Sequence, residues 1–306
     1  MDYKKILKSR SMRLKILGWF QWVPDRTMLQ IQYWIKFGRK LDLKNPKRFT
    51  EKMQWYKLYY RDKTMIQCVD KYDVREYLKR RGFGRILVDN YGVYSSFEEI
   101  DFKQLPKKFI IKDTLGAGGN SVYICDDKSK IDYTELKDRI DNWLGAKQVK
   151  NGGREWPYYS GKQNRIIIEE LLESDSKHGL VDYKFLCFNG KVEMFYVMCD
   201  RIVGKEVKLG IYNRNVERLN VRELTELEID FPFEFPENIC EMINIAEELA
   251  SCFPQVRVDL YNVDGRVTFG ELTFFDESGY MIFDPDSFDT ELGNKFVLPS
   301  PRRDRI

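Results

Sequence analysis

The chain has 306 residues, of which 43% are hydrophobic and 32% are charged, and this length can bury a core shared by two lobes. The sequence has one histidine, which disfavours zinc sites and histidine-dependent triads. Its six cysteines lack C-x-x-C spacing, which favours free thiols in a reducing cytoplasm. The chain lacks both a run of 18 apolar residues and a signal-peptide pattern, so we expect a cytoplasmic protein without a membrane span.

The N-terminal part is strongly basic: residues 1–63 contain 17 lysines and arginines against five acidic residues, whereas the remainder has 34 basic and 43 acidic residues. This asymmetry predicts an anionic partner, which is a membrane surface, a nucleic acid or a substrate. Residues 3–23 follow the pattern of a basic amphipathic helix. This region either contacts the inner face of an anionic membrane through residues 1–25, or the helix packs on the rest of the protein. The chain has no recognised nucleic-acid-binding motif, so nucleic acid is not expected as a partner.

Helices are predicted at residues 26–40, 49–58 and 70–81. The first ends near Gly38, the second begins with Thr50 as its N-cap, and the third stops at Gly82 in a left-handed cap. Short apolar runs at Ile86–Val88 and Tyr91–Tyr94 predict two strands.

A glycine-rich loop lies between two predicted strands, Phe109–Asp113 and Val122–Cys125. The glycines of this loop, Gly116–Asn120, let the backbone approach a ligand closely, so that successive N–H groups can point at a phosphate. Lys112 interrupts the first strand, and a buried ammonium group needs an anion. No Gly-Lys-Ser/Thr and no helix follow the loop, which argues against a Walker P-loop or a Rossmann loop.

Further along the chain we predict a helix at 131–146, a polar and mobile loop at 147–164, an apolar strand at 165–172 and an irregular segment at 202–236. The strands Tyr183–Phe188 and Lys191–Met198, joined by Asn189-Gly190, predict a hairpin with a type I′ turn. A helix is predicted at 239–252, and residues 300–306 are expected to form a frayed basic tail.

Residues 256–273 carry the most informative pattern of charges. They alternate apolar and polar residues on both sides of an Asp-Gly turn, which predicts a hairpin that brings Asp259 and Glu271 side by side, with Arg257 on the face of Asp259. Two carboxylates and a guanidinium on adjacent strands are suited to a magnesium–polyphosphate group. The alternative is a solvated strand face with an ordinary salt bridge.

Six stretches carry a resemblance to a known family: Asn45-Pro46, Phe49–Lys52, Asp70–Tyr77, Asp182–Gly190, Val256–Tyr261 and Phe269–Phe274. Together they resemble the TupA-like family of the ATP-grasp superfamily, found with bacterial envelope-polysaccharide synthesis. The resemblance implies an α+β ATP-grasp fold, in which two α+β lobes clamp a nucleotide. It divides the chain into a basic helical region (1–65), a preceding segment (66–105), a nucleotide-binding lobe with a glycine-rich flap (106–172) and a C-terminal lobe with magnesium-binding strands (173–306).

The resemblance also implies ATP as the nucleotide. The residues that would bind it are Lys71, Lys112, Lys184, the flap residues Gly116, Gly118, Gly119 and Asn120, and the strand end Glu169, Glu170 and Leu172. Lys112 and Lys184 would hold the phosphates, the flap would cover them, and the strand end would contact adenine and ribose. Lys71 would contact the nucleotide, or alternatively it is a surface lysine at the start of a helix.

Magnesium and catalysis are assigned by the same resemblance. Asp259 and Glu271 would bind Mg²⁺ together with Thr273, which stands where the superfamily usually has asparagine. Arg257 would steady the transferring phosphoryl group, with Lys184 as the second catalytic residue.

The implied reaction is that of an ATP-dependent carboxylate–amine ligase, which forms an acylphosphate and then an amide. A uronic acid of a surface polysaccharide or its precursor, such as that of a capsule, would be the acceptor, and an amino acid or another amine would be the donor. Two alternatives are a glycosyltransferase and a kinase that stops at a phosphorylated product. A glycosyltransferase would need an Asp-x-Asp metal motif, and Asp284-Pro285-Asp286 is the only such triplet in the sequence.

Overall fold

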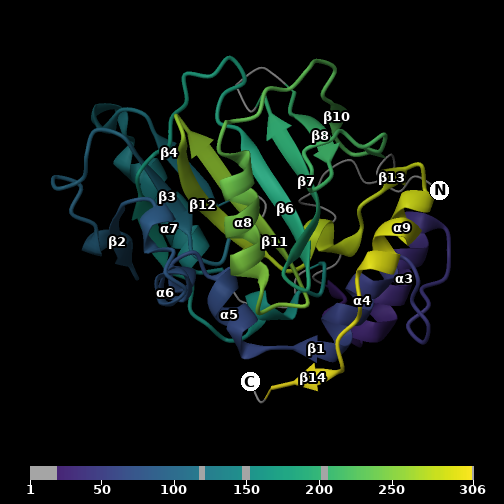
Figure 1. Cartoon of the computed structure of the whole chain (residues 1–306). Helices are drawn as coiled ribbons and strands as arrows, with labels where there is room; N and C mark the ends of the chain where they lie inside the picture. Colours follow the sequence, from purple (N-terminus) through teal and green to yellow (C-terminus); the bar gives the residue numbers. More distant parts are fainter. Residues whose placement is uncertain (1–18, 117–120, 147–151, 201–205, 305–306) are drawn as a thin grey trace.

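The computed structural model describes residues 19–116, 121–146, 152–200 and 206–304 (Figure 1). In these residues a six-stranded sheet, a four-stranded sheet, two sheets of two strands and the helices around them make an α+β fold. The helices are α3 (Asp25–Phe37), α4 (Phe49–Tyr59), α5 (Lys63–Val69), α6 (Asp73–Arg80), α7 (Tyr133–Leu144), α8 (Ile239–Ala250) and α9 (Ser287–Lys295), with the 3-10 turns η1 (Gly84–Ile86), η2 (Phe97–Glu99), η3 (Lys128–Lys130), η4 (Trp156–Tyr159) and η5 (Asp276–Gly279). The strands are β1 (Tyr60–Arg61), β2 (Asn90–Tyr94), β3 (Phe109–Asp113), β4 (Val122–Cys125), β5 (Ile166–Glu169), β6 (Asp182–Phe188), β7 (Lys191–Cys199), β8 (Lys208–Tyr212), β9 (Arg222–Glu223), β10 (Leu227–Glu228), β11 (Gln255–Val263), β12 (Arg266–Thr273), β13 (Phe283–Asp284) and β14 (Arg302–Arg303).

Two hairpins build most of the larger sheet, whose strand order is β10-β8-β7-β6-β11-β12. Asn189 and Gly190 join β6 to β7, Asp264 and Gly265 join β11 to β12, and all four residues have positive φ angles, as type I′ turns require. β11 pairs antiparallel with β6 on one side and with β12 on the other. Both hairpins confirm the sequence prediction.

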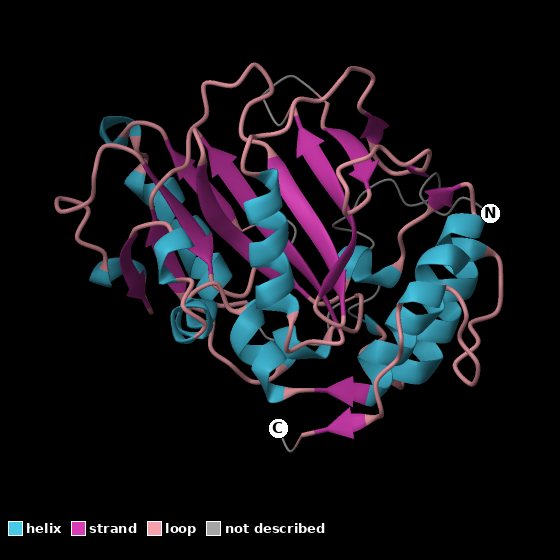
Figure 2. Cartoon of the chain, in the orientation of Figure 1, coloured by secondary structure: helices cyan, strands magenta, loops and turns pink. Residues whose placement is uncertain are grey.

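The central strands of this sheet are buried on both faces. α8 packs across β6, β7 and β11, and its apolar side chains share the main core with those of β11 (Figure 2). The charged residues of β11 are buried as well, with Arg257 8% and Asp259 1% exposed. The interpretation of this strand face as solvated is therefore wrong.

The smaller sheet, with strand order β2-β5-β3-β4, has a core of its own. Phe109 and Ile111 of β3 and Ile166 and Ile168 of β5 cluster there with apolar residues of α7. β2 lies in the segment expected to precede the nucleotide lobe, yet it pairs with β5 inside this sheet. The boundaries given to the four predicted regions stay a proposal.

The helices of the basic N-terminal region pack on the end of the chain, where α4 lies against α9. Asp289 of α9 accepts hydrogen bonds from the backbone N–H (2.9 Å) and the hydroxyl (2.8 Å) of Thr50. Thr50 is thus buried within α4, and its prediction as N-cap is wrong. Glu51 caps the helix instead, because its carboxylate accepts from the backbone N–H groups of Lys47 (2.9 Å) and Arg48 (3.1 Å).

Three further predictions are wrong. No strand forms at residues 86–88, where the turn η1 ends. The segment 202–236, predicted to be irregular, contains β8, β9 and β10. The C-terminal tail, predicted to be frayed, contains β14. β14 pairs in parallel with β1, some 240 positions earlier in the chain. Strands of two residues are too short to show a period of two, so the local pattern does not reveal them.

The polar loop predicted to be mobile makes contacts with other parts of the chain where the structure describes it, from residue 152 onward. Trp156 is 2% exposed, and the backbone oxygen of Gly153 accepts a hydrogen bond from the buried Lys57 (2.8 Å). Arg154 donates to the backbone oxygen of Phe20 (2.7 Å). Within the described part of the chain, none of the helices combines the length and the apolar character that crossing a membrane requires.

Candidate active site

Three charged side chains lie in a row across the middle of the larger sheet. Asp259 on β11 pairs in register with Lys184 on β6 and with Glu271 on β12. A bulge follows at Gly270, where an added Cβ would lie 3.0 Å from the backbone oxygen of Asp259. The structure thus confirms that Asp259 and Glu271 are neighbours, as the hairpin predicted.

Arg257 links the members of this row. Its Nε and Nη2 donate to the two carboxylate oxygens of Asp259 (2.6 and 2.7 Å). Nη2 also donates to Glu271 (2.9 Å) and to the hydroxyl of Thr273 (3.0 Å), and this hydroxyl donates to Glu271 in turn (3.1 Å). Arg257 therefore contacts each of the other three residues predicted to handle metal and phosphate on β11 and β12.

Three residues that the sequence analysis missed complete this charged cluster. Asp276 accepts hydrogen bonds from Nη1 of Arg257 and from the hydroxyl of Tyr196 (2.7 Å). Asp182 forms an ion pair with Lys184 (2.7 Å). Asp182 lies two positions before Lys184, so the strand period places both on one face and would have indicated it. Nothing in the local sequence indicates that Asp276 or Tyr196 reaches Arg257.

Burial and the neighbouring charges together shift the pKa values of Asp259 and Lys184. Burial alone would raise the pKa of Asp259, but Arg257 and Lys184 hold it below its usual range. Burial and Arg257 oppose the charge on Lys184, yet Asp182 and Asp259 keep the pKa of this lysine above its usual value. Both side chains are therefore charged at neutral pH. Such a cluster is suited to binding and stabilising charge rather than to exchanging protons.

The smaller sheet presents a second group of charges. Lys112 on β3 forms an ion pair with Glu169 at the end of β5 (3.0 Å), and Arg75 of α6 contacts the other carboxylate oxygen of Glu169 (3.0 Å). Glu169 is buried, whereas the side chain of Lys112 is 26% exposed. Lys112 is therefore half-buried, with a carboxylate as its partner.

The remaining predicted nucleotide residues lie next to this pair. Lys71 donates to the backbone oxygen of Gly116, and burial lowers the pKa of Lys71. Glu170 forms a double ion pair with Arg266 of β12 (3.1 and 3.2 Å), which joins the two sheets. The other flap residues, Gly118, Gly119 and Asn120, lie outside the described residues.

One cavity of about 1040 Å³ connects both groups of charges. Its lining includes Lys71, Lys112, Gly116, Glu169, Glu170 and Leu172 on one side and Lys184, Arg257, Asp259 and Glu271 on the other. Residues predicted from five separate stretches of the chain thus meet at one space between two sheets. The two acidic side chains expected to bind metal face the same cavity as the lysine expected to bind phosphate.

Two sheets with separate cores and a charged cavity between them agree with the two-lobed ATP-grasp fold that the resemblance implied. The chain belongs to the TupA-like ATPgrasp family, whose sequence model matches residues 51–297. This match confirms the family and the α+β ATP-grasp fold that the sequence predicted.

Solved structures with partial similarity include three ligases. D-alanine–D-alanine ligase from Bacillus anthracis is 17% identical (TM-score 0.44), with 68% of this chain and 57% of that chain covered. Phosphoribosylamine–glycine ligase from Thermotoga maritima is 14% identical (TM-score 0.43; 78% and 58% covered), and L-amino acid ligase from Bacillus licheniformis is 13% identical (TM-score 0.44; 84% and 57% covered). This chain thus spans less than two thirds of these structures. No curated protein sequence matches it.

Proposed function

We propose that the protein is an ATP-dependent carboxylate–amine ligase. The observation that carries this proposal is the shared cavity, in which Lys112 of the smaller sheet faces the same space as Arg257, Asp259 and Glu271 of the larger sheet. Cationic and acidic groups that line one cavity from two sheets suit a nucleoside triphosphate with its metal ion, bound between two lobes.

Under this proposal Lys71, Lys112 and Lys184 bind the phosphates of ATP. Lys112 and Lys184 now contact Glu169 and Asp259, so each ammonium group already points toward the cavity that both carboxylates line. Gly116 begins the flap over the phosphates, and the chain from Glu169 to Leu172 provides the surface for adenine and ribose. Glu170, paired with Arg266, holds this chain against the larger sheet.

The donor set suits Mg²⁺, since Asp259 and Glu271 are adjacent carboxylates and Asp259 is held ionised. These two residues would bind the ion, with the hydroxyl of Thr273 beside them, and the ion would neutralise phosphate charge. The neighbouring Arg257 can then donate to a transferring phosphoryl group with its planar guanidinium.

The chemistry needs no protein nucleophile. A substrate carboxylate attacks the γ-phosphoryl group and releases ADP, and the amine then displaces phosphate from the acylphosphate to form an amide. The protein contributes positioning and charge stabilisation, which dominate phosphoryl transfer. In line with the family resemblance, we assign the acceptor to the uronic acids of a bacterial surface polysaccharide or its precursor, in the cytoplasm where ATP is available, and the donor to amino acids or related amines.

The glycosyltransferase alternative is less favoured by the structure. Asp284 and Asp286 do not belong to the lining of the charged cavity, and their carboxylates form ion pairs with Arg222 and with Arg39 (2.6 Å) elsewhere. A kinase that stops at a phosphorylated product remains the second candidate, because it uses the same nucleotide site.

Trapping with hydroxylamine separates the ligase from the kinase. We expect purified protein with ATP, Mg²⁺ and uronic acids to release ADP and, with hydroxylamine, to yield a hydroxamate, because hydroxylamine attacks an acylphosphate. ADP release without hydroxamate would identify a kinase instead.

Glu271→Gln tests the site itself, since its side chain is 44% exposed and the fold should tolerate the change. We expect the ADP release rate to fall by about 10²-fold or more, with Asp138→Asn on the exposed face of α7 as the matched control. Turnover unchanged in Glu271→Gln and in Asp259→Asn would refute the assignment.

A further inference from the structure

Glu277, in the turn η5, lines the cavity of the candidate active site but has no role in the nucleotide binding proposed above. Its side chain is exposed, and the space that it faces is that of the cavity. Among the described residues, none donates a hydrogen bond to its carboxylate. Glu223, which lines the same cavity, instead accepts two from Thr225 (2.6 and 2.8 Å). The carboxylate of Glu277 can therefore contact a second ligand beside the nucleotide.

The backbone of η5 is strained where it carries this side chain. Glu277 and Ser278 have φ angles of 47° and 53°, in the left-handed region that residues with a Cβ rarely occupy. Such a conformation costs free energy and persists only where the surrounding structure holds it, and this is common at functional sites. The contacts that hold η5 therefore decide where Glu277 points.

Buried residues of α4 hold the turn from one side. The ammonium group of Lys57, which is 1% exposed, donates to the backbone oxygens of Ser278 (2.6 Å) and Gly153 (2.8 Å). Gln54, one helical turn earlier, donates to the backbone oxygen of Gly279 (2.9 Å). A buried ammonium group needs such acceptors, so Lys57 and the turn stabilise each other.

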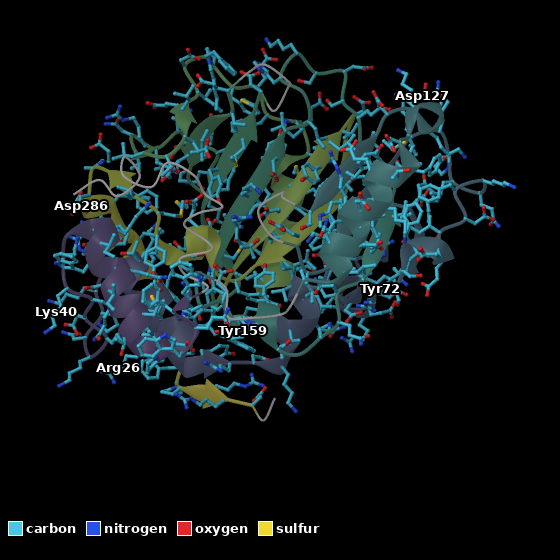
Figure 3. The ribbon with its side chains drawn as sticks, turned by 180° about the vertical axis from the view of Figure 1, so that it is seen from behind. Arg26, Lys40, Tyr72, Asp127, Tyr159 and Asp286 are labelled. Carbon is cyan, nitrogen blue, oxygen red and sulfur yellow. The ribbon has the colours of Figure 1, made fainter. Side chains whose placement is uncertain are left out.

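The segment 152–160 holds the turn from another side. The hydroxyl of Ser278 donates to the carboxylate of Glu155. Farther along the same segment, Tyr159 lies next to the N-terminal helices (Figure 3), close to Asp25 of α3. Two segments that are distant from η5 in the sequence thus fix its conformation, and with it the exposure of Glu277 to the cavity.

The neighbours of Glu277 indicate what its carboxylate can do. The preceding residue, Asp276, accepts a hydrogen bond from Arg257, the residue proposed to contact the transferring phosphoryl group. Although the cavity reaches the side chain, burial by the surrounding protein raises the pKa of Glu277 from 4.5 to about 7. The negative charges of Asp276 and Glu223 act in the same direction. The positive charges of Lys36 and Arg257 act against it. A carboxylate of this kind exchanges a proton near neutral pH.

We propose that Glu277 binds the ammonium group of the donor amine and takes one of its protons, as the general base of amide formation. An ammonium group has no lone pair, so it must lose a proton before it can attack. The neutral amine then attacks the carbonyl carbon of the acylphosphate and the C–N bond forms. The C–O bond to phosphate breaks, and the leaving phosphate takes a second proton from the nitrogen. This inference rests on the ligase function proposed above.

Glu277→Gln separates this role from phosphoryl transfer. Hydroxylamine is neutral at neutral pH and traps the acylphosphate without a base, whereas amino acids and putrescine are protonated and need one. With ATP, Mg²⁺ and glucuronic acid, we expect the ratio of amide to hydroxamate to fall by about 10²-fold in this variant. Glu291→Gln, exposed on α9 and outside the cavity lining, is the matched control and should keep the ratio of the natural chain.

Two outcomes of this experiment have different meanings. An unchanged ratio in Glu277→Gln, whether both products persist or both fall together, would overturn the role as a base and leave the ligase function standing. A natural chain that forms no hydroxamate would overturn both.

A measurement without turnover tests the same carboxylate. In NMR spectra of protein labelled with ¹³C-glutamate, the carboxyl signal that Glu277→Gln lacks should titrate at about pH 7. Putrescine should lower this midpoint, because an ammonium group favours the ionised carboxylate. A midpoint near the ordinary value of 4.5, or one that putrescine leaves unchanged, would contradict the inference.

Discussion

Arg257 determines how the acidic residues of the site are arranged. It is 8% exposed and contacts Asp259, Glu271 and Asp276, so its charge is fully surrounded by oxygen atoms. A nucleotide that enters the cavity brings further negative charge to the same guanidinium. The planar fork of an arginine spreads five N–H groups over three nitrogen atoms and can share them among several such partners, whereas an ammonium group has only three N–H groups on one atom.

We therefore predict that Arg257→Lys keeps the charge but loses most of the activity. The rate of ADP release should fall by about 10²- to 10³-fold, because the lysine cannot contact the carboxylates and a phosphoryl group together. Arg85→Lys, with a side chain that is 67% exposed and outside both the cluster and the cavity lining, is the matched control. Circular dichroism and steady-state kinetics of both variants would check this, and equal kinetics in the two would contradict the role given to Arg257.

The residues of this cluster differ in how far sequence reasoning could find them. Asp259, Glu271 and Arg257 are predictable because a tight turn fixes the pairing of its strands and the period of two fixes the face. Lys112 is predictable as a charged residue that follows two isoleucines and precedes the glycine-rich loop. Asp276 is not, because it lies beyond the end of β12 and reaches Arg257 only through the tertiary fold.

At the level of elements, α8 is fixed to the larger sheet by a polar contact as well as by apolar packing. Glu247 accepts hydrogen bonds from Arg214 (2.7 Å) and from the backbone N–H of Val192 (3.2 Å), and it forms an ion pair with Lys191 (3.3 Å). Arg214 lowers the pKa of Glu247 from its ordinary value of 4.5 to about 2. The carboxylate therefore stabilises the fold only while it is ionised.

The sign of the pH effect follows from this lowered pKa. The contribution of Glu247 is fully present above about pH 4.5 and is lost as the pH falls toward about 2. We predict that Glu247→Gln lowers the free energy of unfolding by about 1–3 kcal/mol at pH 7, and that this difference shrinks steadily between pH 4.5 and pH 2. Urea titrations across this range would measure it, with the exposed Glu241→Gln on the same helix as control. A difference in unfolding free energy between the variant and the natural chain that does not change with pH would contradict this prediction.

The elements that could be predicted are those whose pattern is local. The hairpins β6–β7 and β11–β12 and the helix α8 follow from periodicity and turn residues over fewer than 20 positions. β8 and β14 could not be predicted, since β8 contains Gly210 and β14 has two residues. What makes them strands is a partner strand, and in the case of β14 this partner lies near the other end of the chain.

At the scale of the whole molecule, the two sheets have separate hydrophobic cores and share the charged cavity. Among the described residues, the ion pair of Glu170 and Arg266 is one direct link between them, and exposed ion pairs contribute at most about 1 kcal/mol. A ligand that contacts both walls of the cavity would therefore connect the sheets more strongly than this ion pair does.

Nucleotide binding should consequently protect both sheets together. We predict that ATP with Mg²⁺ slows amide hydrogen exchange in β3 and β5 of the smaller sheet and in β11 and β12 of the larger one, because binding to the native state at 100 times Kd adds about 2.7 kcal/mol to its stability. Lys112→Met and Glu271→Gln each remove a contact from one wall only, so each should reduce the protection in both sheets. If each variant instead loses protection only in the sheet that carries its substitution, the nucleotide contacts the two sheets independently and the cavity does not act as a clamp.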